Sequence, residues 1–233
     1  MTAVHNPSPD EAPDGTDVDD HPRASDGRVP GRRGRATRER LTACTLNMLR
    51  DTNYRDLKVV DIAREAGTSP ATFYQYFPDV ESAILALAED MAIDGNERLT
   101  GIVRGGDWKG KAAYDTAERI ADAYITFWDD NSALMRVLDL TSLEGDERFR
   151  SIRIRLLNEF TVALAGVVQH QRDAGRQPDD VDPMAVAGVL VSMLAHVASH
   201  REGFEGYDIG AADLRRVMAR IVFTTVTGAK APR

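Results

Sequence analysis

The chain has 233 residues, of which 42% are hydrophobic, and it carries a formal net charge of −8 at pH 7. This length fits one large domain or two small ones, and the apolar fraction is sufficient for a buried core. A single cysteine, Cys44, excludes an internal disulfide framework. No apolar run approaches the ~18 residues of a membrane span, and the N-terminus carries no apolar signal-peptide core. We therefore expect a cytoplasmic protein without a membrane partner.

Residues 1–30 are rich in Pro, Asp, Gly and Ser and hold few large apolar side chains. They contain seven acidic residues and two arginines. Such a segment cannot bury enough apolar surface to offset the entropy of folding, so we predict a disordered acidic tail. The sequence leaves open whether this tail has a role, such as competing with DNA for neighbouring arginines.

The charge reverses in the next segment, residues 31–38 (GRRGRATR), which we interpret as a flexible basic arm. Its residues Arg32, Arg33 and Arg35 are candidates to lie along DNA phosphates or to enter a narrow minor groove. A solvated run of charge is the alternative. The first helix is expected at about 37–50.

Residues 58–77 (KVVDIAREAGTSPATFYQYF) have the spacing of two short helices joined by a tight turn. An apolar face at i, i+3, i+4 and i+7 predicts the first helix. Gly67 is typical of its C-terminal end, because glycine tolerates positive φ. Ser69 can cap the second helix, and Pro70 fits its first position.

The second of these helices is predicted to turn two aromatic side chains, Phe73 and Phe77, inward and a polar face outward. Hydroxyl, amide and phenol groups on an exposed helix suit hydrogen bonds to phosphates and base edges. The pattern is that of a helix-turn-helix with the second helix as the reader. The candidate DNA contacts beyond the arm are Lys58, Thr68, Ser69, Pro70, Thr72, Tyr74, Gln75 and Tyr76.

The string GTSPATFYQYF, followed by PDVESAI and preceded by an IA-x-x-AG turn, resembles the TetR (tetracycline-repressor-like) family of bacterial transcription regulators over about residues 35–95. The resemblance implies a DNA-binding domain in residues 31–95 and a helical effector-binding and dimerisation domain in residues 96–228. It also implies a homodimer through the last two long helices, bound to palindromic operator DNA and released by a small effector. The chain has Val80 where the family commonly has a lysine, so one phosphate contact is expected to be missing.

Apolar residues at helical spacing predict the rest of the chain to be helical too, with no alternating run long enough for a strand. After the helix opened by Asp79, glycines in residues 101–110 interrupt the pattern. Further helices are expected at about 111–129, from Asn131 or Ser132 to 140, at 147–173, from Asp182 to Gly203, and at 211–227. The predicted fold is all-α, with a three-helix helix-turn-helix domain, a larger helical domain and about nine helices in all.

An interior effector pocket is expected between the fourth to eighth helices, as the resemblance implies. Apolar walls with few polar groups favour an apolar or amphipathic ligand. Asn158 is the polar candidate, because it interrupts an apolar run; it would otherwise face solvent or satisfy backbone. The full set of candidates is Tyr124, Phe127, Trp128, Met135, Leu138, Phe149, Leu156, Asn158, Phe160 and Met193.

Other classes of function find less support in the sequence. His196 and His200 are four residues apart, but no HExxH motif or further Cys/His cluster accompanies them, so we favour a polar patch over a metal site. We find no phosphate-cradling glycine loop and no nucleophile elbow, and we predict neither catalytic residues nor a cofactor. A helical ligand carrier is the remaining alternative. The sequence favours a DNA-binding regulator, most simply a repressor, and leaves its effector, operator, target genes and direction of regulation open.

Overall fold

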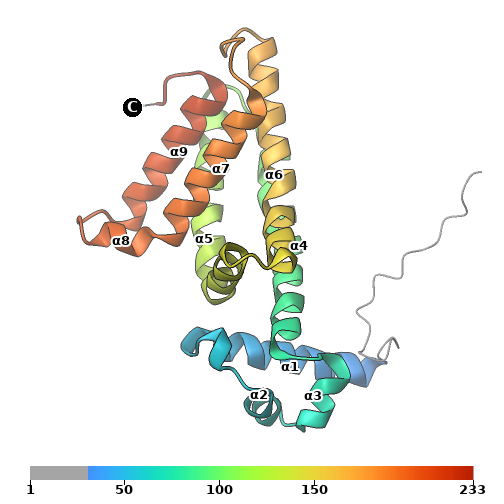
Figure 1. The fold of residues 1–233 in the computed structure, drawn as a ribbon. Helices are drawn as coiled ribbons and strands as arrows, with labels where there is room; N and C mark the ends of the chain where they lie inside the picture. Colours follow the sequence, from blue (N-terminus) through green and yellow to red (C-terminus); the bar gives the residue numbers. More distant parts are fainter. Residues whose placement is uncertain (1–30, 233) are drawn as a thin grey trace, which may run out of the picture.

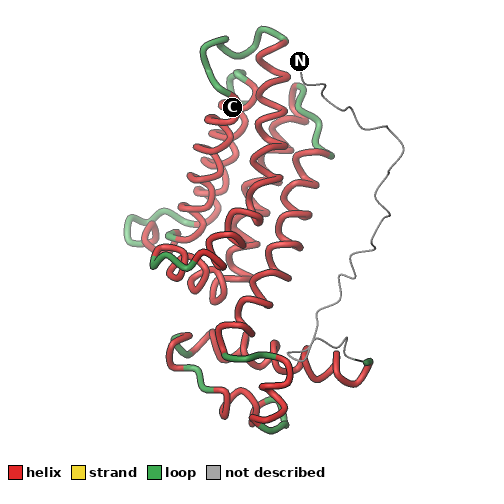
Figure 2. The backbone as a smooth tube through the Cα atoms, turned by 45° about the vertical axis from the view of Figure 1, so that its right-hand side comes forward, coloured by secondary structure: helices red, strands yellow, loops and turns green. Residues whose placement is uncertain are grey.

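The computed structural model describes residues 31–232, apart from the side chain of Glu205; the predicted acidic tail, residues 1–30, lies outside the described residues. The predicted all-α fold is confirmed, since this range contains nine α-helices, one short 3-10 helix and no strand (Figure 2). The elements are α1 (Arg32–Asp51), η1 (Tyr54–Asp56), α2 (Val59–Glu65), α3 (Pro70–Tyr76), α4 (Val80–Arg104), α5 (Gly110–Leu143), α6 (Glu147–Asp173), α7 (Pro183–Ser199), α8 (Arg201–Glu205) and α9 (Ala211–Thr227).

Two units follow each other along the long axis of the molecule (Figure 1). The head consists of α1, η1, α2 and α3, and the body consists of α4 to α9. Helix α4 begins beside the head and runs up into the body, where it packs mainly against α6. In the body, α5 packs against α9 and α6 against α7. None of the described helices is long and apolar enough to cross a membrane.

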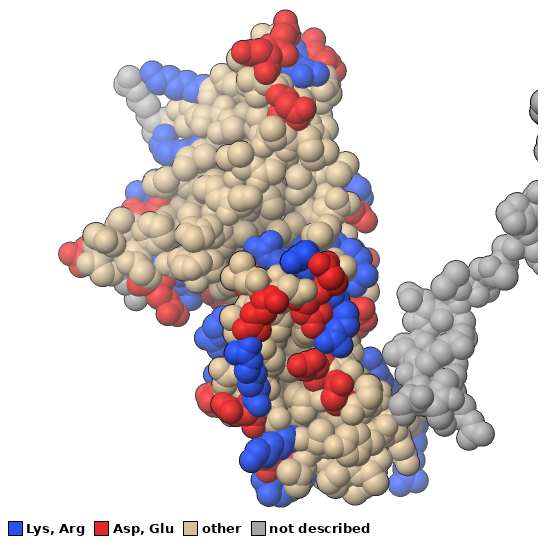
Figure 3. Space-filling view, viewed as in Figure 1, with Lys and Arg blue, Asp and Glu red and all other residues tan. Residues whose placement is uncertain are grey.

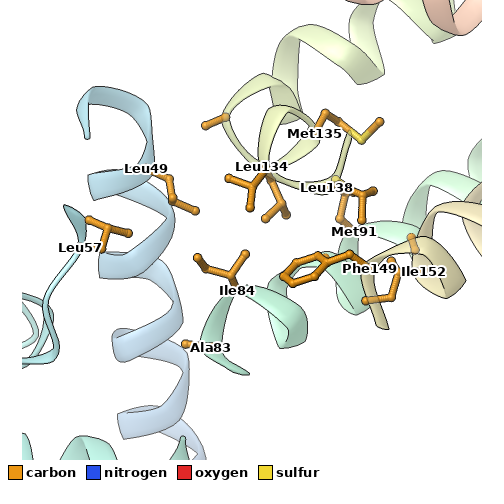
Figure 4. Packing of buried hydrophobic residues seen from close by; sticks show 14 of the residues in the cluster. Leu49, Leu57, Ala83, Ile84, Met91, Leu134, Met135, Leu138, Phe149 and Ile152 are labelled. Carbon is orange, nitrogen blue, oxygen red and sulfur yellow. The ribbon is translucent and has the colours of Figure 1, made fainter. Parts of the chain in front are cut away.

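The head and the lower body share one hydrophobic cluster (Figure 4). Ile84 of α4 is fully buried and lies between Leu49 of α1 and Leu134 of α5. Leu138 and Phe149 continue the cluster into the body. The orientation of the head is therefore set by apolar packing against α4 and the C-terminal part of α5.

The first helix begins earlier than predicted, at Arg32 rather than at about residue 37. The segment expected to be a flexible arm is helical from Arg32 onward, so that prediction is wrong for residues 32–38. Arginine and alanine are good helix formers, and the Thr37 hydroxyl donates to the Arg33 carbonyl (3.1 Å) inside this first part of the helix. The arginines are thus held on a helix that extends from the head.

Helix α5 is a single helix of 34 residues, whereas the sequence predicted a break before a short sixth helix. Asn131 does not cap a new helix; its side chain amide donates to the Phe127 carbonyl of the same helix (2.8 Å). Figure 1 shows the part of α5 after this point turned toward the viewer. A side chain that bonds the i−4 carbonyl is a recognised cause of helix bending.

The helix that begins at Pro183 ends at Ser199, earlier than the predicted stop at Gly203. His200 leaves the helical conformation with φ −116° and ψ 16°. Its Nδ1 lies 2.6 Å from the Ser199 hydroxyl and 3.1 Å from the His196 carbonyl, so local hydrogen bonds accompany the end of the helix. The short helix α8 follows, so the predicted helix count holds with a different division of the chain.

Gly95 permits a close approach inside the body. A Cβ atom at this position would lie 2.5 Å from the Phe127 ring and 2.7 Å from Leu156 Cδ1, both buried. We expect Gly95→Ala to lower the free energy of unfolding by ~1–3 kcal/mol, because the added methyl overpacks this site. Urea unfolding of the full chain measures the change.

Gly101 provides the matched control, since it lies in the same helix and a Cβ there would meet nothing within 4 Å. Gly101→Ala should raise stability by ~0.5–1 kcal/mol through helix propensity alone. Equal effects of the two substitutions would contradict the close packing at Gly95.

Candidate nucleic-acid interface and ligand cavity

The turn between α2 and α3 is closed as the sequence predicted. Gly67 adopts φ +63°, the left-handed conformation that favours glycine. The amide of Gly67 donates to the Arg64 carbonyl (3.0 Å), and the amide of Thr68 donates to the Ala63 carbonyl (2.8 Å). These two bonds form a Schellman ending, which satisfies the last carbonyls of α2 and directs the chain into α3.

Helix α3 is fixed by its cap and by two buried aromatic rings. The Ser69 hydroxyl accepts a hydrogen bond from the Thr72 amide (3.2 Å), and Pro70 occupies the first turn. Phe73 and Phe77 are buried with ring centroids 5.6 Å apart. This anchoring leaves the opposite side of α3 at the surface of the head.

The predicted DNA-contacting residues divide into two groups by exposure. Thr68, Thr72 and Tyr76 are half-buried: the Thr72 hydroxyl lies 3.0 Å from that of Ser69, and the Tyr76 ring packs on the core of the head. These contacts orient the α3 surface. The exposed group is Lys58, Ser69, Pro70, Tyr74 and Gln75.

The arginines of α1 lie at the surface of the same unit. Arg32, Arg33 and Arg35 are exposed. Figure 3 shows Lys and Arg side chains around the lower rim of the head. Val80, which stands where a family lysine was expected, is half-buried against the core of the head and offers no charge. The head thus carries a polar helix surface and an adjoining group of cations.

A small cavity lies inside the body between α4, α5, α6 and α7. Its free volume is about 10 Å³, room for about one water molecule. Five predicted residues line it, namely Tyr124, Phe127, Trp128, Met135 and Leu156. The other lining residues, which were not predicted, are Leu99, Arg153, Leu157 and Ala195.

The cavity contains a buried polar group without a partner. Among the described residues, the Tyr124 hydroxyl has no hydrogen-bond partner, and its side chain is 4% exposed. Burial raises the pKa of this hydroxyl well above its usual range, while the charge of Arg153 opposes that shift. An unsatisfied buried donor costs ~1–3 kcal/mol, and an acceptor atom bound beside it would remove this cost.

The other predicted effector residues lie outside the cavity. Asn158 is exposed on α6, so the expectation of an interior polar group there is wrong: its side of the helix faces away from the apolar stripe. Phe160 supports the cavity indirectly, with its ring 5.3 Å from that of Tyr124. Leu138 and Phe149 belong to the cluster shared with the head, and Met193 is half-buried against the upper core.

The sequence shows Arg153 near the apolar stripe of α6 but does not place it in a cavity wall. It is a charged residue beside the apolar stripe of α6, three positions before Leu156 and four after Phe149.

His196 and His200 stack with ring centroids 4.1 Å apart. In the described part of the chain no group of three or more His, Cys, Asp or Glu side chains could hold a metal ion.

Comparison with protein families places both parts of the chain in one group. Residues 41–87 match a model described as "Bacterial regulatory proteins, tetR family". Residues 99–233 match one described as "Tetracyclin repressor-like, C-terminal domain". The HTH-type transcriptional regulator EthR of Mycolicibacterium smegmatis is 24% identical over 183 residues, which cover 76% of this chain and 82% of EthR.

Solved structures share the fold. A TetR-family transcriptional regulator from Mesorhizobium loti superposes with a TM-score of 0.66 at 19% identity, covering 84% of this chain and 98% of that chain. The FadR regulator from Bacillus subtilis, solved in complex with stearoyl-CoA, gives 0.60 at 14% identity, covering 82% and 98%. At these identities the likeness concerns the fold alone.

The cap of α3 leads to a test that separates stability from binding. Ser69→Ala should lower the free energy of unfolding by ~1 kcal/mol, because the Thr72 amide loses its side-chain acceptor. Ser69→Asp should keep the stability, since aspartate caps equally well. If Ser69 lies beside DNA phosphate, the same aspartate weakens duplex binding, measured by fluorescence anisotropy. Unchanged binding by Ser69→Asp would show that Ser69 only caps the helix.

Proposed function

Because the chain belongs to the TetR family of bacterial regulatory proteins, we propose that it is a repressor released from its operator by a small apolar or amphipathic effector. The family consists of DNA-binding transcriptional regulators, which are not enzymes. The observation that carries the proposal is the polar surface of α3 beside exposed arginines on the head. A cytoplasmic location is expected, because a repressor must reach its operator on the bacterial chromosome.

DNA binding is assigned to the head. Helix α3 presents Tyr74 and Gln75 at an exposed surface, and amide and phenol groups can bond base edges in a major groove. The α1 arginines and Lys58 supply positive charge that can pair with DNA phosphates. Such contacts provide affinity without sequence preference. A dimer with two such heads ~34–36 Å apart would contact successive major grooves of a near-palindromic site.

Dimerisation is assigned to α7 and α9. Four apolar side chains on these helices are exposed: Met184 (49%), Val189 (70%), Val217 (52%) and Ile221 (38%). Figure 3 shows that the face formed by α7 and α9 carries few charged side chains. Large exposed apolar patches are typical of interfaces, and a second copy of the chain is the occupant that family membership favours.

Effector binding is assigned to the cavity in the body, with a route to the head through α5. The C-terminal part of α5 contributes Met135 to the cavity and Leu134 to the cluster with Leu49 and Ile84. Its last residues also contact the head, since Arg55 of η1 pairs with Glu144. An effector that moves this part of α5 would reorient the head, and the DNA-binding and effector-binding conformations would differ in affinity.

One structural neighbour favours a ligand with a long apolar part. The FadR protein of Bacillus subtilis was solved with stearoyl-CoA, an amphipathic molecule. The apolar walls of the cavity in this chain are compatible with the tail of such a ligand, provided that the walls open, because the free volume is small.

Selection from a random duplex pool tests DNA recognition. We expect the full-length protein to enrich a near-palindromic sequence. The double variant Tyr74→Ala/Gln75→Ala should lose this preference, because each lost base contact costs ~1–3 kcal/mol of discrimination. Tyr207→Ala, an exposed residue of the body, is the control and should enrich the same site. Failure of the wild-type protein to enrich any sequence would favour the ligand carrier instead.

Salt dependence tests the arginines. The triple variant Arg32→Gln/Arg33→Gln/Arg35→Gln should weaken binding to all duplexes alike and reduce the slope of log K against log[salt] by ~0.9 for each lost phosphate contact. Arg119→Gln, at an exposed position on α5, should leave the slope unchanged. A triple variant with the wild-type slope would show that these residues do not touch phosphate.

A further inference from the structure

A groove of about 710 Å³ opens on the surface between the C-terminal part of α5, α6 and α7. Its walls combine apolar and cationic side chains. Leu140 and Leu143 are exposed there, with 38% and 86% of their surface accessible, and three arginines, Arg136, Arg150 and Arg153, also line it. A groove of this size accommodates a drug-sized molecule, in contrast to the closed cavity beneath it.

The charge of the groove is opposite to that of the chain. Three arginines face one acidic lining residue, Asp139, although the protein as a whole carries −8. Arg153 Nε donates to Asp139 (2.6 Å), and Arg150 pairs with Glu147. Among the described side chains, Arg136 has no ion-pair partner. An unpaired arginine at the mouth of a partly apolar groove suits a carboxylate or phosphate group.

The groove and the interior cavity are adjacent. Trp128, Arg153, Leu157 and Ala195 line both, so these four residues form a wall that the groove and the cavity share. Tyr124, whose hydroxyl has no hydrogen-bond partner among the described residues, also lines the cavity. Rotation of Trp128 or Leu157 would join the two spaces into one site with a cationic mouth, an apolar interior and one free hydrogen-bond donor.

We propose that the effector is an amphipathic anion: its carboxylate or phosphate group binds Arg136, with Arg150 and Arg153 nearby, and its apolar part passes Trp128 and Leu157 into the cavity. This inference rests on the proposed function and specifies the ligand class. The Tyr124 hydroxyl donates to an acceptor atom carried on the apolar part. Ligands with such an atom therefore bind more tightly than purely hydrocarbon tails.

The position of Arg136 connects this site to the head. Arg136 lies on the segment of α5 whose opposite side holds Leu134 and Leu138 in the cluster with the head. It also lines a second groove formed with Arg50 and Tyr54 at the end of α1 and in η1. An anion bound to Arg136 would thus lie on the same segment of α5 that supports the head.

Three probes with the same tail test the proposal: dodecanoate, dodecyl phosphate and dodecan-1-ol, each below its aggregation concentration. Binding is followed in the full-length protein by the fluorescence of Trp128, in a Trp108→Phe background that removes the only other tryptophan. We expect at least one anion to bind ten times more tightly than the alcohol. Dodecanoate and dodecyl phosphate distinguish the two head groups.

Arg136→Gln should weaken binding of the anion about tenfold and leave binding of dodecan-1-ol unchanged. Arg119→Gln is the control, because Arg119 is exposed on α5 and does not line the groove. Calorimetry provides a second readout if the fluorescence does not change. Equal affinities of anion and alcohol, or anion binding that survives Arg136→Gln, would overturn the proposal.

DNA binding separates this proposal from the proposed function. The selected duplex is titrated with protein in the presence and absence of the tightest probe. If the duplex binds but neither anion does, the ligand class is wrong and the DNA-binding role stands. If an anion binds through Arg136 but the duplex is not released, the anion site stands and effector-controlled release is wrong. Release that requires Arg136 supports both.

Discussion

The apolar packing of Ile84 between α1 and α5 is the contact on which the arrangement of the two units depends. Ile84 and Leu138 are fully buried, and Leu49 and Leu134 nearly so. Burying one such side chain contributes ~1.5–3 kcal/mol, far more than a surface ion pair. A closely packed interface resists continuous deformation, so the head is expected to switch between discrete orientations when α5 moves.

Ion pairs around this junction have a different role. Arg55 pairs with Glu144, and Arg148 lies 3.1 Å from Glu81, with all four side chains about half-exposed. Each such pair contributes ~0–1 kcal/mol, so these contacts add little to stability. They are directional, however. The first pair connects η1 to the end of α5, and the second connects the start of α4 to the start of α6. Their loss or exchange would cost little, which is compatible with the proposed reorientation of the head.

Local chemistry made the turn and the cap of the head predictable, whereas the cavity of the body depended on packing. Ser69 and Gly67 act on neighbouring backbone groups, so their roles could be predicted from spacing alone. Asn131 has the same chemistry as a capping residue, but tertiary packing continues α5 through it, and its amide bonds the i−4 carbonyl instead. For Asn158 the periodicity of α6 already placed the residue off the apolar stripe. Arg153 lies beside that stripe, yet only the packing of α5 and α7 makes it part of a cavity wall.

The closed state of the cavity sets a condition on regulation. Opening it must disrupt packing around Trp128 and Leu157, and the free energy of that change comes from the ligand. The apolar part of the proposed ligand would gain by burial, and the Tyr124 hydroxyl would offer a further gain, since no group among the described residues accepts a hydrogen bond from it. A ligand favours the open conformation only by its difference in affinity between the two conformations. A group that finds its partner only after opening contributes fully to that difference, whereas an anion held at the exposed Arg136 binds both conformations more equally. In the proposed site, the cationic mouth would therefore select the class of ligand, and the interior would supply the change in conformation.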